Sequence, residues 1–231
     1  KYLIADDTAY ILGGRNSNNL FLGAYRDTYN IDRDLYVLER TEKNASDVMQ
    51  KKERNSLQDI KAYFEKIWVQ PDQKIFRKKE TEKTKEGLAL LREHYKELQT
   101  AYPEAFSENE TLLTQDLIRV DSIQFLHNPL YADEKVPVVY QRICQEMEQG
   151  ETILIQTPYI ICDKGMYQDL SELCRAGKQI EIITNAVESG ANPWGCTDYL
   201  NERKSILKTG AGVYACMAGQ SLHTKTVLID D

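Results

Sequence analysis

Two short stretches, at opposite ends of the printed chain, share the same spacing of lysine and aspartate. Residues 223–231 read His-Thr-Lys-Thr-Val-Leu-Ile-Asp-Asp, and residues 1–7 read Lys-Tyr-Leu-Ile-Ala-Asp-Asp. Successive side chains of a β-strand point to opposite faces, so we expect His223 and Lys225 to share one face of a strand. Asp230 follows Lys225 by an odd number of residues, so we expect it on the other face or at the strand end, as a structural brace. The repeat predicts two related halves, the second of which places an imidazole beside an ammonium group.

The spacing His-x-Lys-x4-Asp resembles the HKD motif of the phospholipase D superfamily. The first copy also matches a Gly-Gly-x-Asn segment that follows the motif in that superfamily, and its matching residues are Lys1, Asp6, Gly13, Gly14 and Asn16. Four further segments resemble the bacterial cardiolipin synthase branch: Asn16-x4-Phe21-Leu22-Gly23, Arg33-Asp34, Thr157-Pro158-Tyr159 and Thr184-Asn185. Because the chain starts within one copy and finishes within another, we expect it to be a fragment of a longer protein with two lobes.

The resemblance implies an α/β, phospholipase D-like fold, with a mixed or parallel sheet flanked by helices and parts of two pseudo-symmetric lobes. Residues 1–115 would be the C-terminal part of the first lobe, with a helical insert, and residues 116–231 the N-terminal part of the second lobe. The apolar pattern predicts strands at Ser122–Leu126, Thr152–Gln156, Gln179–Thr184, Gly212–Cys216 and around His223. It predicts helices between them at Lys135–Glu148, Lys164–Ala176 and Thr197–Lys208. In the first half it predicts a hairpin over residues 1–13, a strand at Asp34–Glu39, and helices at Ser46–Trp68 and Gly87–Thr100.

The resemblance also implies a chemical role for each matching residue. A phosphodiester site needs cations and neutral donors aimed at the phosphate oxygens, with a nucleophile and an acid for the leaving alcohol. His223 corresponds to the nucleophile or the general acid. Lys1 and Lys225 correspond to the groups that hold the non-bridging oxygens, and Asn16 to a hydrogen-bond donor, although an asparagine after two glycines is also a common turn residue. The structural residues of the two motif copies would be Asp6, Gly13, Gly14 and Asp230.

Asp34 corresponds to the carboxylate that orients one active-site imidazole and stabilises its charged form. The alternative is that Asp34 forms a surface ion pair with Arg33 or Arg26. Three residues near the carboxyl ends of predicted strands, where open α/β sheets place ligands, are expected to contact substrate: Asn185, Ser189 and Tyr159. Packing in the core is the alternative for Tyr159.

Composition narrows the class of ligand. The net charge of −7 and the pI of about 5.2 argue against a sequence-independent nucleic-acid binder, which needs a basic surface. The five cysteines are odd in number and widely spaced, without a C-x-x-C pair, so we expect reduced thiols, no metal site and no cofactor. No apolar run approaches the roughly 20 residues that a membrane span requires.

The resemblance therefore predicts a phosphatidyltransferase of cardiolipin synthase type that acts through a phosphohistidine intermediate. Its substrate would be an anionic phospholipid similar to phosphatidylglycerol, at the cytoplasmic face of the cell membrane, with the protein peripheral or anchored by a segment outside this chain. The alternatives are a hydrolytic phospholipase D or phosphodiesterase, and a catalytically inactive scaffold that binds lipid or protein. His94 and His127 do not match the motif, so this chain by itself is expected to bind a phosphate group without turning it over.

Overall fold

The structure is a computed structural model, and it describes residues 1–22, 30–39, 55–74, 80–106, 114–131, 133–188, 193–217 and 219–230. By its internal contacts the chain divides into two compact units, one formed by Lys1–Lys61 with Phe125–Asp231 and the other by Ala62–Gln124. The lobe boundary expected between residues 115 and 116 is a division by sequence repeat rather than by contact, and it stays a prediction. Ser46, where a helix was expected to begin, lies outside the described residues.

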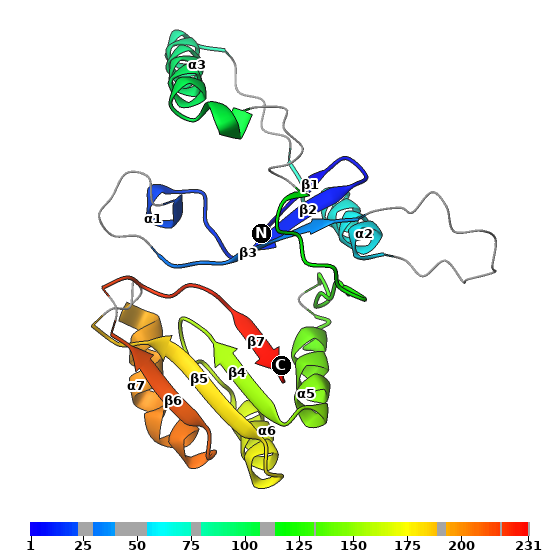
Figure 1. Ribbon diagram of the computed structural model, residues 1–231, viewed down its shortest axis with the longest axis vertical. Coiled ribbons are helices and arrows are strands. Elements are labelled where there is room, and N and C mark those ends of the chain that lie inside the picture. The colour runs from blue at the N-terminus through cyan, green and yellow to red at the C-terminus, as the bar shows by residue number, and fades with distance from the viewer. Residues whose placement is uncertain are drawn as a thin grey trace, which may run out of the picture. The chain divides into compact units, whose positions relative to one another are not determined.

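The first sheet has three antiparallel strands in the order β1-β2-β3, which are Tyr2–Ala5, Ala9–Gly13 and Asp34–Leu38. Strands β1 and β2 form the predicted hairpin around a tight turn at residues 6–8 (Figure 1). Helix α2 (Ser56–Trp68) contributes to the core of this sheet because its first two turns carry apolar residues at helical spacing. The shared core is formed by Tyr10, Val37, Leu57 and Ile60.

The second sheet has four strands in the order β6-β5-β4-β7, which are Gly212–Cys216, Gln179–Asn185, Thr152–Gln156 and Thr226–Ile229. Strands β4, β5 and β6 are parallel, and β7 runs antiparallel to β4. Two crossover helices, α6 (Lys164–Arg175) and α7 (Pro193–Lys208), connect the parallel strands, and α5 (Val138–Gln149) precedes β4. The predicted α/β fold with a mixed sheet flanked by helices is confirmed.

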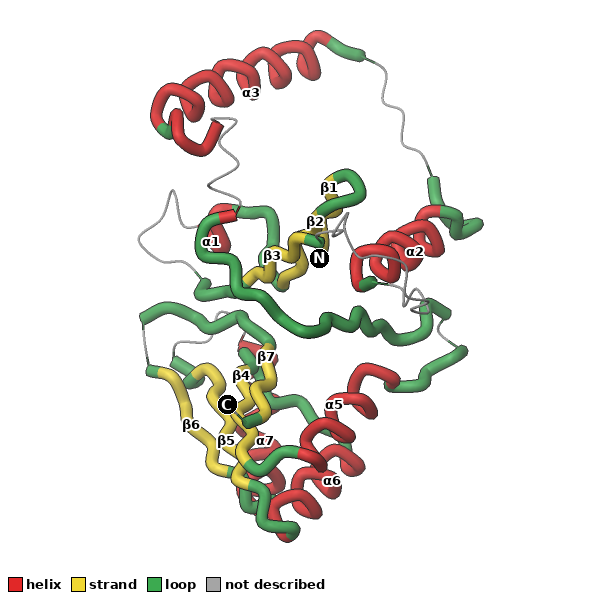
Figure 2. The backbone as a smooth tube through the Cα atoms, turned by 45° about the vertical axis from the view of Figure 1, so that its right-hand side comes forward, coloured by secondary structure: helices red, strands yellow, loops and turns green. Residues whose placement is uncertain are grey.

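Helices α5, α6 and α7 pack on the same face of the second sheet (Figure 2). In β4, β5 and β7, alternate residues lie opposite one another in neighbouring strands and point toward the helices. Their burial explains why β-branched residues are frequent in these three strands. The buried core consists of Met147, Ile153, Ile160, Leu170, Leu173, Ile180, Ile182, Ile206 and Ala211. On the opposite face, Tyr214 and Leu228 are 53% and 51% exposed. Within the described residues, the helices therefore cover one face of this sheet.

Three remaining elements lie elsewhere in the chain: α1 (Asn19–Leu22), α3 (Glu82–Ala101) and a short 3-10 helix at Pro103–Phe106. Helix α3 begins with a capping box in which Thr81 and Thr84 bond each other's backbone N–H groups. Among the described helices, none is both long enough and apolar enough to span a membrane.

The strand predicted at Ser122–Leu126 is wrong. These residues form no regular element, and Phe125 packs against the core of the first sheet. The apolar pattern of the segment reflects this contact, and the described edges of the second sheet are β6 and β7.

Candidate active site

His223 lies just before β7, in a segment that contacts the first half of the chain. Strand β7 begins at Thr226, so the prediction that His223 and Lys225 belong to one strand is wrong. The backbone here pairs with Ile31 instead: Ile31 N–H donates to the Ser221 carbonyl at 2.8 Å, and His223 N–H donates to the Ile31 carbonyl at 2.7 Å. These bonds bring the second motif against the loop before β3.

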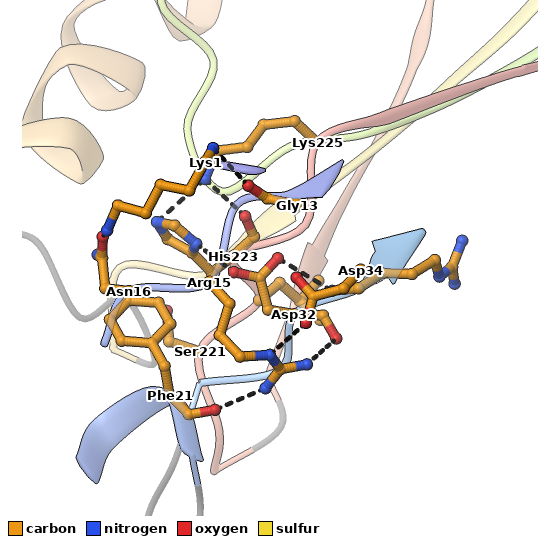
Figure 3. Close-up of polar contacts among 12 residues, drawn as sticks. Lys1, Gly13, Arg15, Asn16, Phe21, Asp32, Asp34, Ser221, His223 and Lys225 are labelled. Atoms are coloured by element: carbon orange, nitrogen blue, oxygen red, sulfur yellow. Dashed lines mark hydrogen bonds and ion pairs between the residues drawn. The ribbon is translucent and has the colours of Figure 1, made fainter. Parts of the chain in front are cut away.

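The His223 imidazole is held at both of its nitrogens (Figure 3). Its Nδ1 lies 2.8 Å from Oδ2 of Asp32, whose side chain is 1% exposed. Because a carboxylate only accepts hydrogen bonds, Nδ1 carries a proton and Nε2 is left as the nitrogen that can accept one. Lys225 Nζ donates to that Nε2 at 3.0 Å and to the His223 carbonyl at 2.6 Å. The arrangement directs Nε2 into a site that already contains a cation.

The side chain of Lys225 is exposed, but its surroundings still change the proton affinity of its ammonium group. Loss of hydration lowers the pKa of its ammonium group, and the negative charge of Asp32 opposes this effect. An ammonium group that is poorly hydrated gains more from an anionic ligand than one in water, because the ligand restores the lost stabilisation. The site is therefore suited to a phosphate oxygen.

The carboxylate that meets the imidazole is Asp32, whereas the sequence interpretation assigned this role to Asp34. Asp34 instead receives a hydrogen bond from Nε of Arg15 at 2.5 Å, and Arg15 is neither of the two arginines expected to pair with it. The reason lies in the backbone: Asp34 is the first residue of β3, whereas Asp32 lies in the loop that pairs with residues 221–223.

The two glycines at the end of β2 allow both carboxylates to approach. A side chain at Gly13 would clash with the Asp34 carboxylate, and one at Gly14 would meet both Asp32 carboxylate oxygens at 3.3 Å. The Gly-Gly of the motif is therefore explained by the space that Asp32 and Asp34 need.

Two residues that sequence reasoning did not assign complete the support of His223. The Phe21 ring packs edge-on against the imidazole, with ring centroids 4.8 Å apart. Arg15 donates from Nη1 to the Phe21 carbonyl at 2.6 Å and from Nη2 to the Asp32 carbonyl at 3.3 Å. The sequence could have pointed to both residues, because Phe21 and the Gly-Gly-x-Asn segment that contains Arg15 belong to the matched pattern.

Lys1 and Asn16 form a pair within the first motif copy. Lys1 Nζ donates to Asn16 Oδ1, and Gly13 N–H donates to the Lys1 carbonyl at 2.9 Å, which ties the start of β1 to the end of β2. An amide whose oxygen accepts a hydrogen bond retains its N–H groups as donors. Figure 3 shows this pair together with the residues around His223. Lys1 and Asn16 as phosphate-binding residues stay a prediction.

The aspartates of the two motif copies have matching backbone conformations. Asp6 and Asp230 both have positive φ, 50° and 56°, a conformation rare for residues other than glycine. Asp230 Oδ1 accepts from the N–H groups of Glu151 and Thr152, each at 2.8 Å, and these bonds lower its pKa. Asp230 thus braces the start of β4 against the end of β7.

The three residues expected at strand ends differ in their surroundings. Asn185 is 2% exposed and hydrogen-bonds protein groups, so the structure places its side chain in the interior rather than at a substrate. The ring of Tyr159 lies against Gly195, where an added side-chain atom would be 2.6 Å from it. Substrate contact by Tyr159 stays a prediction, and Ser189 lies outside the described residues.

The residues at the site carry no set of ligands suited to a metal. In the described ranges, no three His, Cys, Asp or Glu residues are grouped closely enough to hold a metal ion. Among the described residues near the His223 ring, Lys225 and Arg15 carry positive charge.

One family of known proteins matches the C-terminal part of the sequence. Residues 143–231 match the family model described as "Cardiolipin synthase, PLD-like domain". This C-terminal segment is therefore similar to the phospholipase D-like domain of cardiolipin synthases. The resemblance inferred from the two motif copies is thereby confirmed for this superfamily.

Two individual proteins are also similar to this chain. Over 81 residues it is 36% identical to the major cardiolipin synthase ClsA of Bacillus subtilis (strain 168), an alignment that covers 35% of this chain and 16% of that protein. The crystal structure of the phosphatidylserine synthase of Haemophilus influenzae Rd KW20 has a TM-score of 0.54 and 18% identity. That match covers 97% of this chain and 49% of the other, and at this identity it concerns the fold. The chain spans less than half the length of both relatives.

Proposed function

We propose that this phospholipase D-like chain is part of a phosphatidyltransferase of cardiolipin synthase type. The observation that carries the proposal is the contact of Asp32 with His223 Nδ1, which leaves Nε2 facing Lys225. A phosphodiester placed there would meet a nucleophilic or acidic nitrogen together with cations for its non-bridging oxygens.

Nε2 of His223 is the reacting atom, because Asp32 holds the other nitrogen. As nucleophile, Nε2 bonds to phosphorus while the bond from phosphorus to the leaving alcohol breaks, and a second motif histidine gives that oxygen its proton. The incoming alcohol then loses its proton to the second histidine and bonds to phosphorus, and the phosphohistidine bond breaks. If His223 is the acid, the same steps occur with the two histidines exchanged. Asp32 stabilises the positive charge that develops on the His223 ring in either role.

Lys1, Lys225 and Asn16 are proposed to hold the non-bridging oxygens. Charge on these oxygens increases as phosphorus is attacked, so donors fixed around them lower the barrier more than they stabilise the substrate. The names of the two relatives, a cardiolipin synthase and a phosphatidylserine synthase, support a phospholipid as the substrate class. We propose an anionic phospholipid similar to phosphatidylglycerol, at the cytoplasmic face of a membrane on which the protein is peripheral or anchored.

The printed chain holds three histidines, and His223 is the one that matches the motif. His94 is paired with Glu97 on exposed α3 at 3.0 Å, and His127 Nδ1 lies 2.8 Å from the Asn128 carbonyl. The mechanism needs two imidazoles on opposite sides of phosphorus. We therefore propose that the 231-residue chain alone binds phosphate or an anionic head group but does not turn over.

The test compares the 231-residue chain with the same chain extended at both ends by its natural sequence so that both motifs are complete, here called the extended protein. In the extended protein we expect transfer of a phosphatidyl group to phosphatidylglycerol in mixed vesicles. His223→Ala should reduce turnover by several orders of magnitude, and a chelator should leave it unchanged because the protein supplies the positive charge. Free phosphatidate as the main product would instead indicate a hydrolase.

Activity of His223→Ala within tenfold of the wild type would refute the assignment of His223. Steady turnover by the 231-residue chain, abolished by the same substitution, would show that one motif histidine suffices. Absence of any phospholipid turnover by the extended protein, with binding retained, would favour the inactive scaffold.

A further inference from the structure

The side chain of Asn185 is fully engaged in the protein interior. It follows the buried residue Thr184 at the carboxyl end of β5 and is 2% exposed. Its Oδ1 accepts from the Leu222 N–H at 2.7 Å. Its Nδ2 donates to the Leu222 carbonyl at 2.9 Å, to the Pro158 carbonyl at 3.1 Å and to Ser221 Oγ at 3.1 Å. An amide has two donor hydrogens and an acceptor oxygen, so both ends are satisfied and the orientation of the group is determined.

The amide of Asn185 makes the backbone hydrogen bonds with Leu222 that a neighbouring strand would make in a sheet. It bonds both the N–H and the carbonyl of that residue, which directly precedes His223. On the other side, Ile31 bonds the carbonyl of Ser221 and the N–H of His223. The backbone from residue 221 to residue 223 is therefore held between Asn185 and Ile31, although it belongs to neither sheet.

The two supports act on different parts of His223. Asn185 and Ile31 hold its backbone, while Asp32, the residue after Ile31, holds its ring through Nδ1 at 2.8 Å. The ring keeps its place relative to Asp32 only if the backbone of residues 221–223 stays at a fixed distance from the loop before β3. Such distances matter, since misplacing a reacting group by about 1 Å can reduce a rate by about 100-fold.

We propose that Asn185 is a positioning residue for His223, which sets the imidazole against Asp32 without contacting the substrate. This inference rests on the proposed role of His223. It assigns Asn185 a role different from the substrate contact expected from the sequence, because an interior amide with its bonds made to the protein has no group left for a ligand.

The test uses Asn185→Ala and a matched control, Thr209→Val. Thr209 is also buried, at 5% exposure, and its Oγ1 donates to the Ile206 carbonyl at 2.6 Å and accepts from the Ala211 N–H at 3.2 Å. It lies in the connection from α7 to β6, at the amino end of the parallel strands, whereas His223 lies beyond their carboxyl ends. Both substitutions remove buried hydrogen bonds, but only one of them removes bonds to the segment before His223.

The first readout is the NMR spectrum of the 231-residue chain with 15N-labelled histidine, in which three rings are observed. We expect Asn185→Ala to shift or broaden the ring signals of His223 while those of His94 and His127 stay in place. Thr209→Val should lower the unfolding midpoint without moving the His223 signals. If Asn185→Ala does not fold, Ser221→Ala removes one acceptor of the same amide and should give a smaller shift of the same signals.

The second readout is steady-state kinetics of the extended protein. Asn185→Ala should lower kcat by roughly tenfold to 100-fold and change KM by less than about threefold, as expected for a misplaced catalytic group. Thr209→Val should change neither by more than about twofold. Unchanged His223 signals and unchanged kcat in a folded but destabilised Asn185→Ala would overturn the inference and leave Asn185 a stability residue. Failure of the proposed function would appear separately, as full activity of His223→Ala.

Discussion

Replacing Asp32 by asparagine tests the contact on which the proposed mechanism depends. The substitution preserves the size of a side chain that is 1% exposed, so the fold should persist while the negative charge at His223 Nδ1 is lost. A hydrogen bond to a charged group contributes about 1.5–3 kcal/mol. Because about 1.36 kcal/mol corresponds to a factor of ten, the loss predicts a kcat lower by roughly 10-fold to 150-fold.

The loss exceeds this range if the new amide turns its N–H2 group toward the ring. Nδ1 would then have to accept, the proton would move to Nε2, and the lone pair that faces Lys225 would be lost. An exchange of tautomer of this kind in the serine protease triad costs about 10⁴ in kcat. The expected range for Asp32→Asn is therefore about 10-fold to 10⁴-fold.

Asp34→Asn is the matched control, because it makes the same chemical change two residues away. Asp34 pairs with Arg15, and their side chains are 29% and 33% exposed, so solvent screens the pair. Such a pair contributes about 0–1 kcal/mol, which predicts at most a fivefold change of kcat. The assay is phosphatidyl transfer by the extended protein, with urea unfolding of each variant to show that it is folded. Equal or greater loss of kcat for Asp34→Asn would refute the assignment of Asp32 and restore the sequence interpretation.

Two further predictions concern proton binding. Loss of hydration lowers the pKa of Lys225, so its ammonium group loses its proton below the ordinary value of 10.5, and activity should fall with rising pH before that point. Lys225→Arg, whose guanidinium stays charged, should move this alkaline decline to higher pH. A decline that does not move would show that another group titrates. Hydrogen bonds from Thr152 and Glu151 lower the pKa of Asp230 below its ordinary 3.8, so its contribution to the free energy of unfolding is present above that value and is lost as the pH falls through the lowered pKa. Asp230→Ala should therefore be less stable than the wild type at pH 7 and approach it in strongly acidic buffer in urea-unfolding experiments, whereas a difference that does not depend on pH would exclude the charge of Asp230 as its source.

The local pattern of the chain was sufficient for most of the regular structure around the site. Strands Thr152–Gln156 and Gly212–Cys216 were predicted at the residues where they occur, because a short apolar run between two helical segments has few other interpretations. The phased motif copies likewise led to the superfamily and to His223 and Lys225, which indeed lie in hydrogen-bond contact. These features depend on residues close in sequence, and their spacing can be read along the chain.

Only the tertiary structure decided which distant groups meet. Asp32 and Asp34 are the same residue type two positions apart, so their spacing offers no reason to prefer either; Asp32 reaches His223 because its loop pairs with residues 221–223, 191 positions away. Asn185 was correctly placed at a strand end, yet its amide turns inward to hold Leu222. Each of these outcomes is a contact between segments that are remote in sequence, and it is determined by the path of the backbone rather than by local composition.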